Sequence, residues 1–276
     1  MKLGTATSVL YLYSIQDAIP LIKRAGYDGV DIWGGRPHVY RQDLSVEELQ
    51  SLRQAILDQG MSVSSFMPAF YRYPHSLSNP NPKVRQDSID YMRMCVDNAA
   101  ALGAEVVLVV PDFSLHGQSR QDSLNRLIES IDTVAQYTAQ HPEIMLGIEI
   151  LYTDETDLVN SAADAQAIIE QLGHSNIGAV LDTGTLNLSK EPIEDIFSLL
   201  GEKVLQIHAN DNNGEHRQQN LIPGDGTFDF QGLTTFLKGI GYEGFLSAEL
   251  SKEYADDVEA ALTATAKRMR AWIQAS

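Results

Sequence analysis

Short runs of apolar residues alternate along this chain with longer amphipathic segments. Each apolar run is four to six residues long and rich in β-branched or large apolar side chains. The segments between the runs carry apolar residues at helical spacing, and this alternation is typical of βα units around a parallel sheet. We expect a helix after each of eight strands, which we place at Leu3–Thr7, Val30–Trp33, Ser62–Met67, Val106–Val110, Met145–Ile150, Gly178–Leu181, Val204–His208 and Phe245–Leu250.

Glycine marks the expected ends of five helices. In each case the next apolar run begins within a few residues, and the dipeptides are Ala25-Gly26, Gln59-Gly60, Leu102-Gly103, Leu172-Gly173 and Ile240-Gly241. Glycine takes up the left-handed conformation that ends a helix at little steric cost. This regularity favours a closed (β/α)8 barrel over a doubly wound sheet. We therefore predict the α/β fold class and a single TIM-barrel domain over residues 1–276, with its active site at the carboxyl ends of the strands.

Composition narrows the classes of partner. Hydrophobic residues make up 43% of the chain and charged residues 21%, which is enough to bury a large core. The net charge of −17 repels polyanions, and no run of Lys and Arg offsets it, so we expect no nucleic-acid partner. The one cysteine, Cys95, lies in an apolar helical stretch, where we expect an inert buried thiol.

We expect a cytoplasmic protein. A lone cysteine fits a reducing compartment, the first residues do not read as a cleaved export signal, and no apolar stretch is long enough to span a membrane. Whether the protein forms a homo-oligomer, either a dimer or a tetramer, stays open.

Four polar residues interrupt or end predicted strands that should be apolar. Glu149 interrupts MLGIEIL, Asp182 ends GAVLD, His208 ends VLQIH, and Glu249 lies in FLSAEL. In a barrel of this kind, catalytic groups lie at the carboxyl ends of the strands. These residues fall on strands five to eight, so we expect them to be neighbours around one half of the rim.

Three converging carboxylates are costly to bury unless a cation neutralises them. Three carboxylate oxygens and one imidazole nitrogen suit Mn²⁺, Mg²⁺ or Co²⁺, and Zn²⁺ also fits. The alternative is four separate polar groups, each satisfied by its own neighbours or by a salt bridge. Because the four occupy equivalent strand ends, we favour one divalent metal ion, with Mn²⁺ as the first candidate.

At these residues the sequence resembles the sugar isomerase and epimerase superfamily of xylose-isomerase-like barrels. That superfamily holds its metal with Glu, Asp, His and Glu on successive strands. Within it, the chain looks most like the D-tagatose 3-epimerase and fructoselysine 3-epimerase group, because of the segment GYDGVDIWGGRPH at residues 26–38. The resemblance covers essentially the whole chain, and further matching segments are IEILYTDE (148–155), HANDNNG (208–214), LIPGDG (221–226) and GYEGFLSAEL (241–250).

Two positions depart from the tagatose 3-epimerase pattern. Thr185 stands where those enzymes have a substrate-binding histidine, and Gly214 stands where they have an arginine. The sugar-binding half of their site therefore does not carry over to this chain.

The chemistry that fits such a site is proton abstraction beside a carbonyl group. The metal would stabilise the developing negative charge as a Lewis acid, with a base on one face of the sugar and an acid on the other. Glu149 and Glu249 are placed to take these two roles, and the resemblance implies the same roles. Asp182 and His208 would then be ligands only. The expected reaction is ketose 3-epimerisation through a metal-stabilised cis-enediolate, or a closely related aldose-ketose isomerisation.

Five further residues are candidate substrate contacts. Glu155 matches a glutamate of the family that touches the substrate, or it is a solvated loop acid. Trp33 would stack on a sugar face or pack the barrel top, and His38 would contact the substrate, support the site or lie exposed. His216 and Arg217, after strand seven, would grip a distal group of the substrate or belong to a flexible polar loop.

Three other functions compete with epimerisation. A lyase or hydrolase acting on 3-oxo-sugars or glycosides, of the kind that cleaves C-glycosides, would use the same metal and proton chemistry. An abasic-site endonuclease of the same superfamily needs several zinc ions, many histidines and a basic face, and this chain has seven histidines. A metal-bound sugar sensor without catalysis is the fourth class. The sequence shows no glycine-rich phosphate loop, so nothing in it indicates a phosphorylated substrate.

Overall fold

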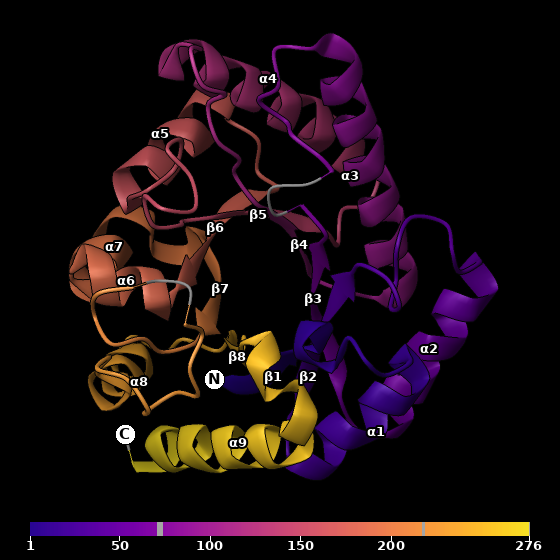
Figure 1. Ribbon diagram of the computed structural model, residues 1–276, viewed down its shortest axis with the longest axis vertical. Coiled ribbons are helices and arrows are strands. Elements are labelled where there is room, and N and C mark those ends of the chain that lie inside the picture. Colours follow the sequence, from indigo (N-terminus) through magenta and orange to yellow (C-terminus); the bar gives the residue numbers. More distant parts are fainter. Residues whose placement is uncertain (71–73, 217–218, 276) are drawn as a thin grey trace.

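The computed structural model describes residues 1–70, 74–216 and 219–275. Its strands form a closed parallel barrel in which each strand pairs with the next in sequence and the last pairs with the first (Figure 1). The predicted (β/α)8 barrel is therefore confirmed, and its extent as one domain stays a prediction. The strands are β1 (Lys2–Ala6), β2 (Gly29–Gly34), β3 (Ser62–Pro68), β4 (Val106–Val109), β5 (Met145–Glu149), β6 (Ile177–Asp182), β7 (Val204–Ala209) and β8 (Phe245–Ala248).

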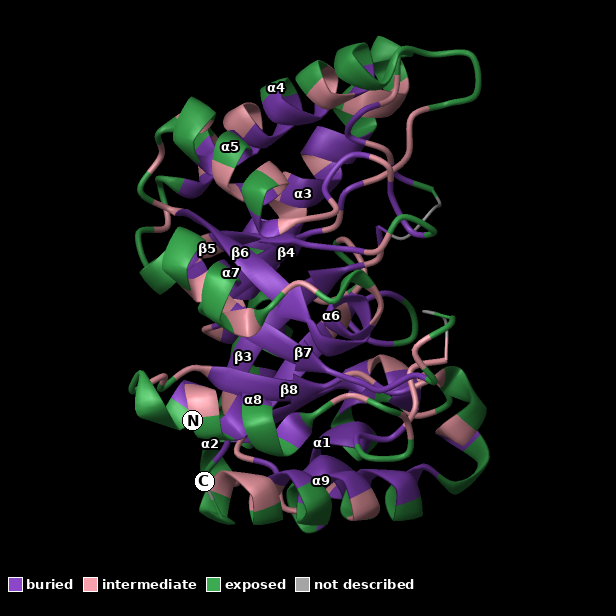
Figure 2. Ribbon diagram, turned by 90° about the vertical axis from the view of Figure 1, so that its left-hand side faces the viewer, coloured by how far each residue is buried: buried purple, intermediate pink, exposed green. Residues whose placement is uncertain are grey.

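Helices surround the barrel (Figure 1). They are α1 (Ile15–Ala25), α2 (Val46–Asp58), α3 (Pro82–Leu102), α4 (Arg120–Thr138), α5 (Ala162–Leu172), α6 (Thr183–Ser189), α7 (Ile193–Leu200), α8 (Phe230–Gly239) and α9 (Val258–Ala275). Three 3-10 turns accompany them: η1 (Thr7–Leu10), η2 (Gly201–Lys203) and η3 (Lys252–Asp257). The strands are buried, whereas the helices bury one face and expose the other (Figure 2).

The expectation of one helix after each strand is wrong after β6. Two helices follow it, because the backbone of Lys190 turns left-handed with φ of 56° and ends α6. Pro192 then caps the start of α7. Proline has no N–H to continue a helix and disfavours helical geometry in the residue before it, so α6 and α7 stay separate.

The predicted strand ends need small corrections at the rim. β8 ends at Ala248 rather than Leu250, because its pairing with β1 stops where Thr5 faces Ala248. β1 likewise ends at Ala6, one residue before the predicted Thr7, which begins η1. Residues beyond these ends belong to the rim of the barrel and are free to turn toward its mouth.

The glycine signals are confirmed. Gly26, Gly103 and Gly173 are left-handed caps of α1, α3 and α5, and Gly60 and Gly241 also have positive φ. Cys95 is buried and free, as expected. Within the described part of the chain, no helix combines the length and apolarity that crossing a membrane requires.

Candidate active site

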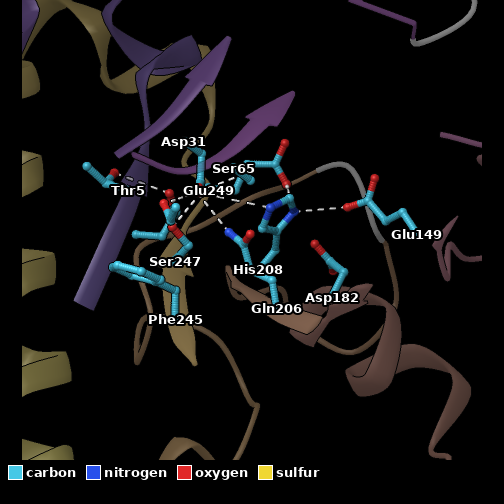
Figure 3. Close-up of polar contacts among 12 residues, drawn as sticks. Thr5, Asp31, Ser65, Glu149, Asp182, Gln206, His208, Phe245, Ser247 and Glu249 are labelled. Carbon is cyan, nitrogen blue, oxygen red and sulfur yellow. Dashed lines mark hydrogen bonds and ion pairs between the residues drawn. The ribbon is translucent and has the colours of Figure 1, made fainter. Parts of the chain in front are cut away.

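Four polar side chains converge at the carboxyl ends of β5 to β8. Glu149 is the last residue of β5, Asp182 is the last of β6, and His208 is the next-to-last of β7. Glu249 directly follows β8. One ligand atom from each side chain lies within 4.8 Å of those from the other three, and Figure 3 shows the group around the His208 ring. The four side chains thus gather as the sequence predicts.

His208 lies at the centre of this metal cluster, by which we mean Glu149, Asp182, His208 and Glu249. Its Nδ1 is 3.0 Å from Oε1 of Glu149 and 3.6 Å from Oε2 of Glu249. Burial by itself lowers the pKa of the imidazole. The hydrogen bond and charge of Glu149, together with the charges of Glu249 and Asp31, outweigh burial and raise the pKa to about 10. Without a metal, the protonated ring therefore offsets part of the carboxylate charge.

The chemistry of the metal cluster fits a divalent cation. Asp182 and His208 are fully buried, Glu149 is 6% exposed, and the side chain of Glu249 is 23% exposed. Three carboxylates and one imidazolium leave an excess of two negative charges in a mostly buried space. Such an excess is unfavourable unless a cation offsets it, and the oxygen and nitrogen donors suit Mn²⁺, Mg²⁺, Co²⁺ or Zn²⁺.

Asp182 is held at both of its carboxylate oxygens. Oδ1 accepts a hydrogen bond of 2.9 Å from the backbone N–H of Thr185, which makes Asp182 the N-cap of α6. Oδ2 accepts one of 2.7 Å from Nδ2 of Asn210. The hydroxyl of Thr183 in turn donates to the carbonyl of Asn210 over 2.5 Å. These contacts fix the orientation of Asp182, as the outer contacts of metal ligands commonly do.

A cavity of about 710 Å³ lies beside the metal cluster, within the size range of small-molecule sites. Glu149 and Glu249 line it, whereas Asp182 and His208 are not among its lining residues. Its apolar lining includes the following side chains from the strand ends and loops of β2 to β5: Trp33, Met67, Phe70, Leu108, Val110 and Leu151. The two glutamates of the cluster can therefore reach a bound molecule, and the other two ligands lie behind them.

Trp33 and His38 occupy different positions relative to this cavity. Trp33 lines it, and its indole ring lies edge-on to the ring of His38 at 5.8 Å. His38 is buried behind the indole and is not a lining residue, and its Nδ1 lies 3.1 Å from Oγ1 of Thr7. Burial lowers the pKa of His38, although the backbone of Leu10 and Tyr13 acts in the opposite direction. His38 thus contacts Trp33 rather than the cavity.

Of the other predicted substrate contacts, Glu155 lines the cavity and is 8% exposed. His216 is exposed in the loop after β7 and lies outside the cavity lining. Arg217 lies outside the described residues.

Sequence reasoning missed Asp211, which organises the long loop after β7. Its carboxylate accepts hydrogen bonds of 2.9 to 3.1 Å from five backbone N–H groups, those of Asn212, Gly224, Gly226, Thr227 and Phe228. A side chain at Gly226 would collide with this carboxylate and with the carbonyl of Asn212, which explains the glycine. The available signal was an acid inside HANDNNG, three residues after His208.

Asp31, in the middle of β2, was also missed. It is fully buried, and its Oδ2 lies 3.9 Å from Nε2 of His208. The metal cluster was predicted from acids within strands that should be apolar. The same criterion applies to Asp31 in GVDIWG.

Several known proteins of similar sequence are sugar epimerases. The fructoselysine 3-epimerase of Shigella flexneri is 25% identical over 271 residues, which make up 98% of this chain and 98% of that protein. The D-psicose 3-epimerase of Agrobacterium fabrum is 23% identical over 240 residues, which cover 83% of this chain and 78% of that protein.

The fold also matches solved structures. The D-psicose 3-epimerase from Clostridium cellulolyticum, solved with D-tagatose, matches with a TM-score of 0.80 over 99% of both chains at 16% identity. The family model described as "Xylose isomerase-like TIM barrel" matches residues 19–275. The chain therefore belongs to the xylose isomerase-like TIM barrel family.

Proposed function

We propose that this protein is a divalent-metal-dependent sugar epimerase that inverts C3 of a ketose, with Glu149 and Glu249 as its two acid/base groups. The observation that carries the proposal is the division within the metal cluster. Glu149 and Glu249 line the cavity, whereas Asp182 and His208 do not. Two carboxylates are thus available both to a metal and to a substrate, and the names of the similar proteins support a sugar as that substrate.

The four residues of the metal cluster have different roles in the proposed reaction. When bound, the divalent ion supplies a Lewis acid next to the carbonyl oxygen on which negative charge develops. One of Glu149 and Glu249 removes the proton from C3, and the other delivers a proton to the opposite face. Asp182 and His208 hold the ion and take no part in proton transfer. We propose Mn²⁺ as the ion, because three oxygens and one nitrogen suit it.

The cavity lining supports contacts to the rest of the sugar. Trp33 offers an aromatic face on which a sugar ring can pack, and Glu155 offers a carboxylate for a hydroxyl group. His38 contributes through its contact with Trp33, and Gly35 assists, because a side chain there would collide with the indole.

The test of the reaction is isotope incorporation. A panel of free ketoses incubated with the Mn²⁺-loaded protein in D₂O should take up deuterium at C3, and the C3 epimer should accumulate, as followed by NMR. Deuterium at C1 or C2 with formation of an aldose would replace the proposal with an aldose-ketose isomerase. Release of a substituent from a 3-oxo-glycoside, without exchange in free ketoses, would replace it with a lyase.

The roles of the two glutamates can be separated with glutamine variants. We expect Glu149→Gln and Glu249→Gln each to exchange the C3 proton of one epimer, opposite in the two variants, without net epimerisation. Because glutamine keeps one oxygen for the metal, turnover should fall more than metal affinity does. Glu170→Gln, which alters an exposed position on α5, is the matched control and should epimerise like the wild type. Near wild-type epimerisation by either cluster variant contradicts the two-base mechanism.

A further inference from the structure

Asp31, in β2, places a buried carboxylate beside His208 of the metal cluster (Figure 3). Its side chain is fully buried, and in β2 it pairs with Ala6 on one side and Ser65 on the other. A carboxylate at such a position is costly unless it is well solvated by protein groups. It therefore calls for an explanation beyond packing.

Four donors surround this carboxylate. Oδ1 accepts hydrogen bonds from the hydroxyl of Ser64, from the hydroxyl of Ser65 at 2.9 Å and from Nε2 of Gln206 at 2.8 Å. Oδ2 accepts a hydrogen bond from the hydroxyl of Ser247. Hydroxyl and amide donors directed at both oxygens take the place of water around the carboxylate. Asp31 is thus held in place by side chains of β3, β7 and β8.

The two oxygens of Asp31 differ in their surroundings. Oδ1 has three donors, whereas Oδ2 has one and faces the imidazole of His208, whose Nε2 is 3.9 Å away. Among the residues that the structure describes, Nε2 has no hydrogen-bond partner, although it is fully buried. The ring therefore has carboxylates on two sides, with Nδ1 toward Glu149 and Glu249 and Nε2 toward Asp31.

A ring nitrogen that binds a metal must offer its lone pair, so the proton of a neutral imidazole has to sit on the other nitrogen. A carboxylate on the far side of the ring favours this tautomer and holds the ring in orientation. The charge of Asp31 is placed for this effect on Nε2.

We propose that Asp31 is a positioning residue for the metal site: its carboxylate keeps the proton of His208 on Nε2, so that Nδ1 faces the divalent ion. The inference rests on the proposed metal site and adds a fifth residue to it. Asp31 itself touches neither the ion nor the substrate. Of its donors, Ser247 binds Oδ2, which faces the ring, whereas Ser64, Ser65 and Gln206 share the other oxygen.

The first test compares two variants by their affinity for Mn²⁺, measured by calorimetry on the purified protein. Asp31→Asn removes the charge with little change of shape, and we expect the Kd for Mn²⁺ to rise about 10-fold to 100-fold. Ser65→Ala is the matched control, because it removes a donor from the oxygen that faces away from His208. We expect its Kd to stay within about twofold of the wild-type value.

A second measurement does not need the Asp31 and Ser65 variants. In wild-type protein with ¹⁵N-labelled histidine and loaded with Zn²⁺, the His208 ring should show a slowly exchanging proton on Nε2 and none on Nδ1. The signal is assigned by its absence in His208→Asn. A proton on Nδ1, with Nε2 bare, overturns the inference.

The outcomes separate this inference from the function proposed above. Wild-type protein that binds neither Mn²⁺ nor Zn²⁺ overturns the metal site and the inference with it. Wild-type protein that binds Mn²⁺ while Asp31→Asn binds it equally well overturns the inference alone. A similar loss of affinity in Asp31→Asn and Ser65→Ala also overturns it, because Asp31 would then act only through the packing of the barrel interior.

Discussion

Asp211 and Asp182 are both fully buried at the rim, yet their carboxylates have different surroundings. Asp211 accepts hydrogen bonds from five backbone N–H groups and lies outside the metal cluster. Asp182 accepts two hydrogen bonds and has Glu149 and Glu249 as close neighbours. Backbone dipoles therefore compensate the charge of Asp211 whatever is bound, whereas the charge around Asp182 calls for a cation.

This difference distinguishes a carboxylate that stabilises the fold from carboxylates that can bind a metal or a substrate. A carboxylate saturated with N–H donors orders a loop and has little capacity left for a ligand. Carboxylates that lie close to one another in a mostly buried space can instead offer lone pairs to a metal and a substrate, at a cost to the stability of the metal-free protein. Oδ1 of Asp31 has three donors, as a carboxylate that supports the fold does. Oδ2 faces His208 and can therefore act on the metal cluster.

The largest effect that we expect comes from Asp211→Ala. The change removes an acceptor from five backbone N–H groups, of which that of Thr227 also donates to the carbonyl of Asn212. Each N–H group left unpaired costs about 1 to 3 kcal/mol. We expect the free energy of unfolding to fall by roughly 4 kcal/mol or more. Urea denaturation of the metal-free protein measures it. A loss below about 1 kcal/mol would mean that water replaces the carboxylate and that the comparison fails.

A slightly smaller effect should follow from the metal. Adding Mn²⁺ to 1,000 times its Kd should raise the free energy of unfolding by about 4 kcal/mol, and EDTA should remove the gain. Asp182→Asn and His208→Ala should lose most of the gain, because each removes or weakens one of four ligands. Thermal unfolding together with metal analysis measures both quantities. Full metal occupancy in both variants would refute the assignment of the ligands.

His75 tests a third way to bury an ionisable group, which is to keep it neutral. Its ring is stacked 4.0 Å from that of Tyr91, and neither ring nitrogen hydrogen-bonds to a described residue. Burial, and then the charge of Arg41, lower its pKa from 6.5 to about 4, although Asp87 acts against them.

The consequence is a loss of stability in acid. Above pH 6.5 the ring is neutral in both the folded and the unfolded chain, so it contributes no pH dependence. As the pH falls from 6.5 to about 4, the unfolded chain binds the proton first, and the free energy of unfolding should drop by up to about 2 to 3 kcal/mol. His75→Phe keeps the stacking and should lose this part of the pH dependence in urea titrations of metal-free protein. Identical pH profiles for the two proteins would exclude the effect.

The smallest effect is expected at an exposed carboxylate. Glu259 on α9 pairs with Arg24 over 3.1 Å, and both side chains are more than half exposed. We expect Glu259→Gln to change the free energy of unfolding by less than about 1 kcal/mol, since water already solvates both charges. Denaturation at low and high salt measures it. A loss as large as that of Asp211→Ala would show that burial does not govern the cost of removing a carboxylate here.

The sequence alone determined the architecture and the metal cluster. The βα rhythm and the glycine caps are local patterns, with spacing set by the geometry of a strand or a helix. The four residues of the metal cluster could be found because barrel topology brings the carboxyl ends of successive strands to one rim. A charged residue at such an end, such as Asp182 or His208, therefore stands out within an apolar run.

Only the tertiary structure decided which groups surround these ligands. Asp31 meets Gln206 and Ser247 across 175 and 216 positions of the chain, and no local pattern encodes such contacts. The same holds for His38, which the sequence offered as a substrate contact and which lies behind Trp33. Hydrogen bonds and ring contacts depend on where closure of the barrel places side chains from distant strands. The sequence therefore reveals which residues carry charge, and the fold determines which of those charges are already compensated.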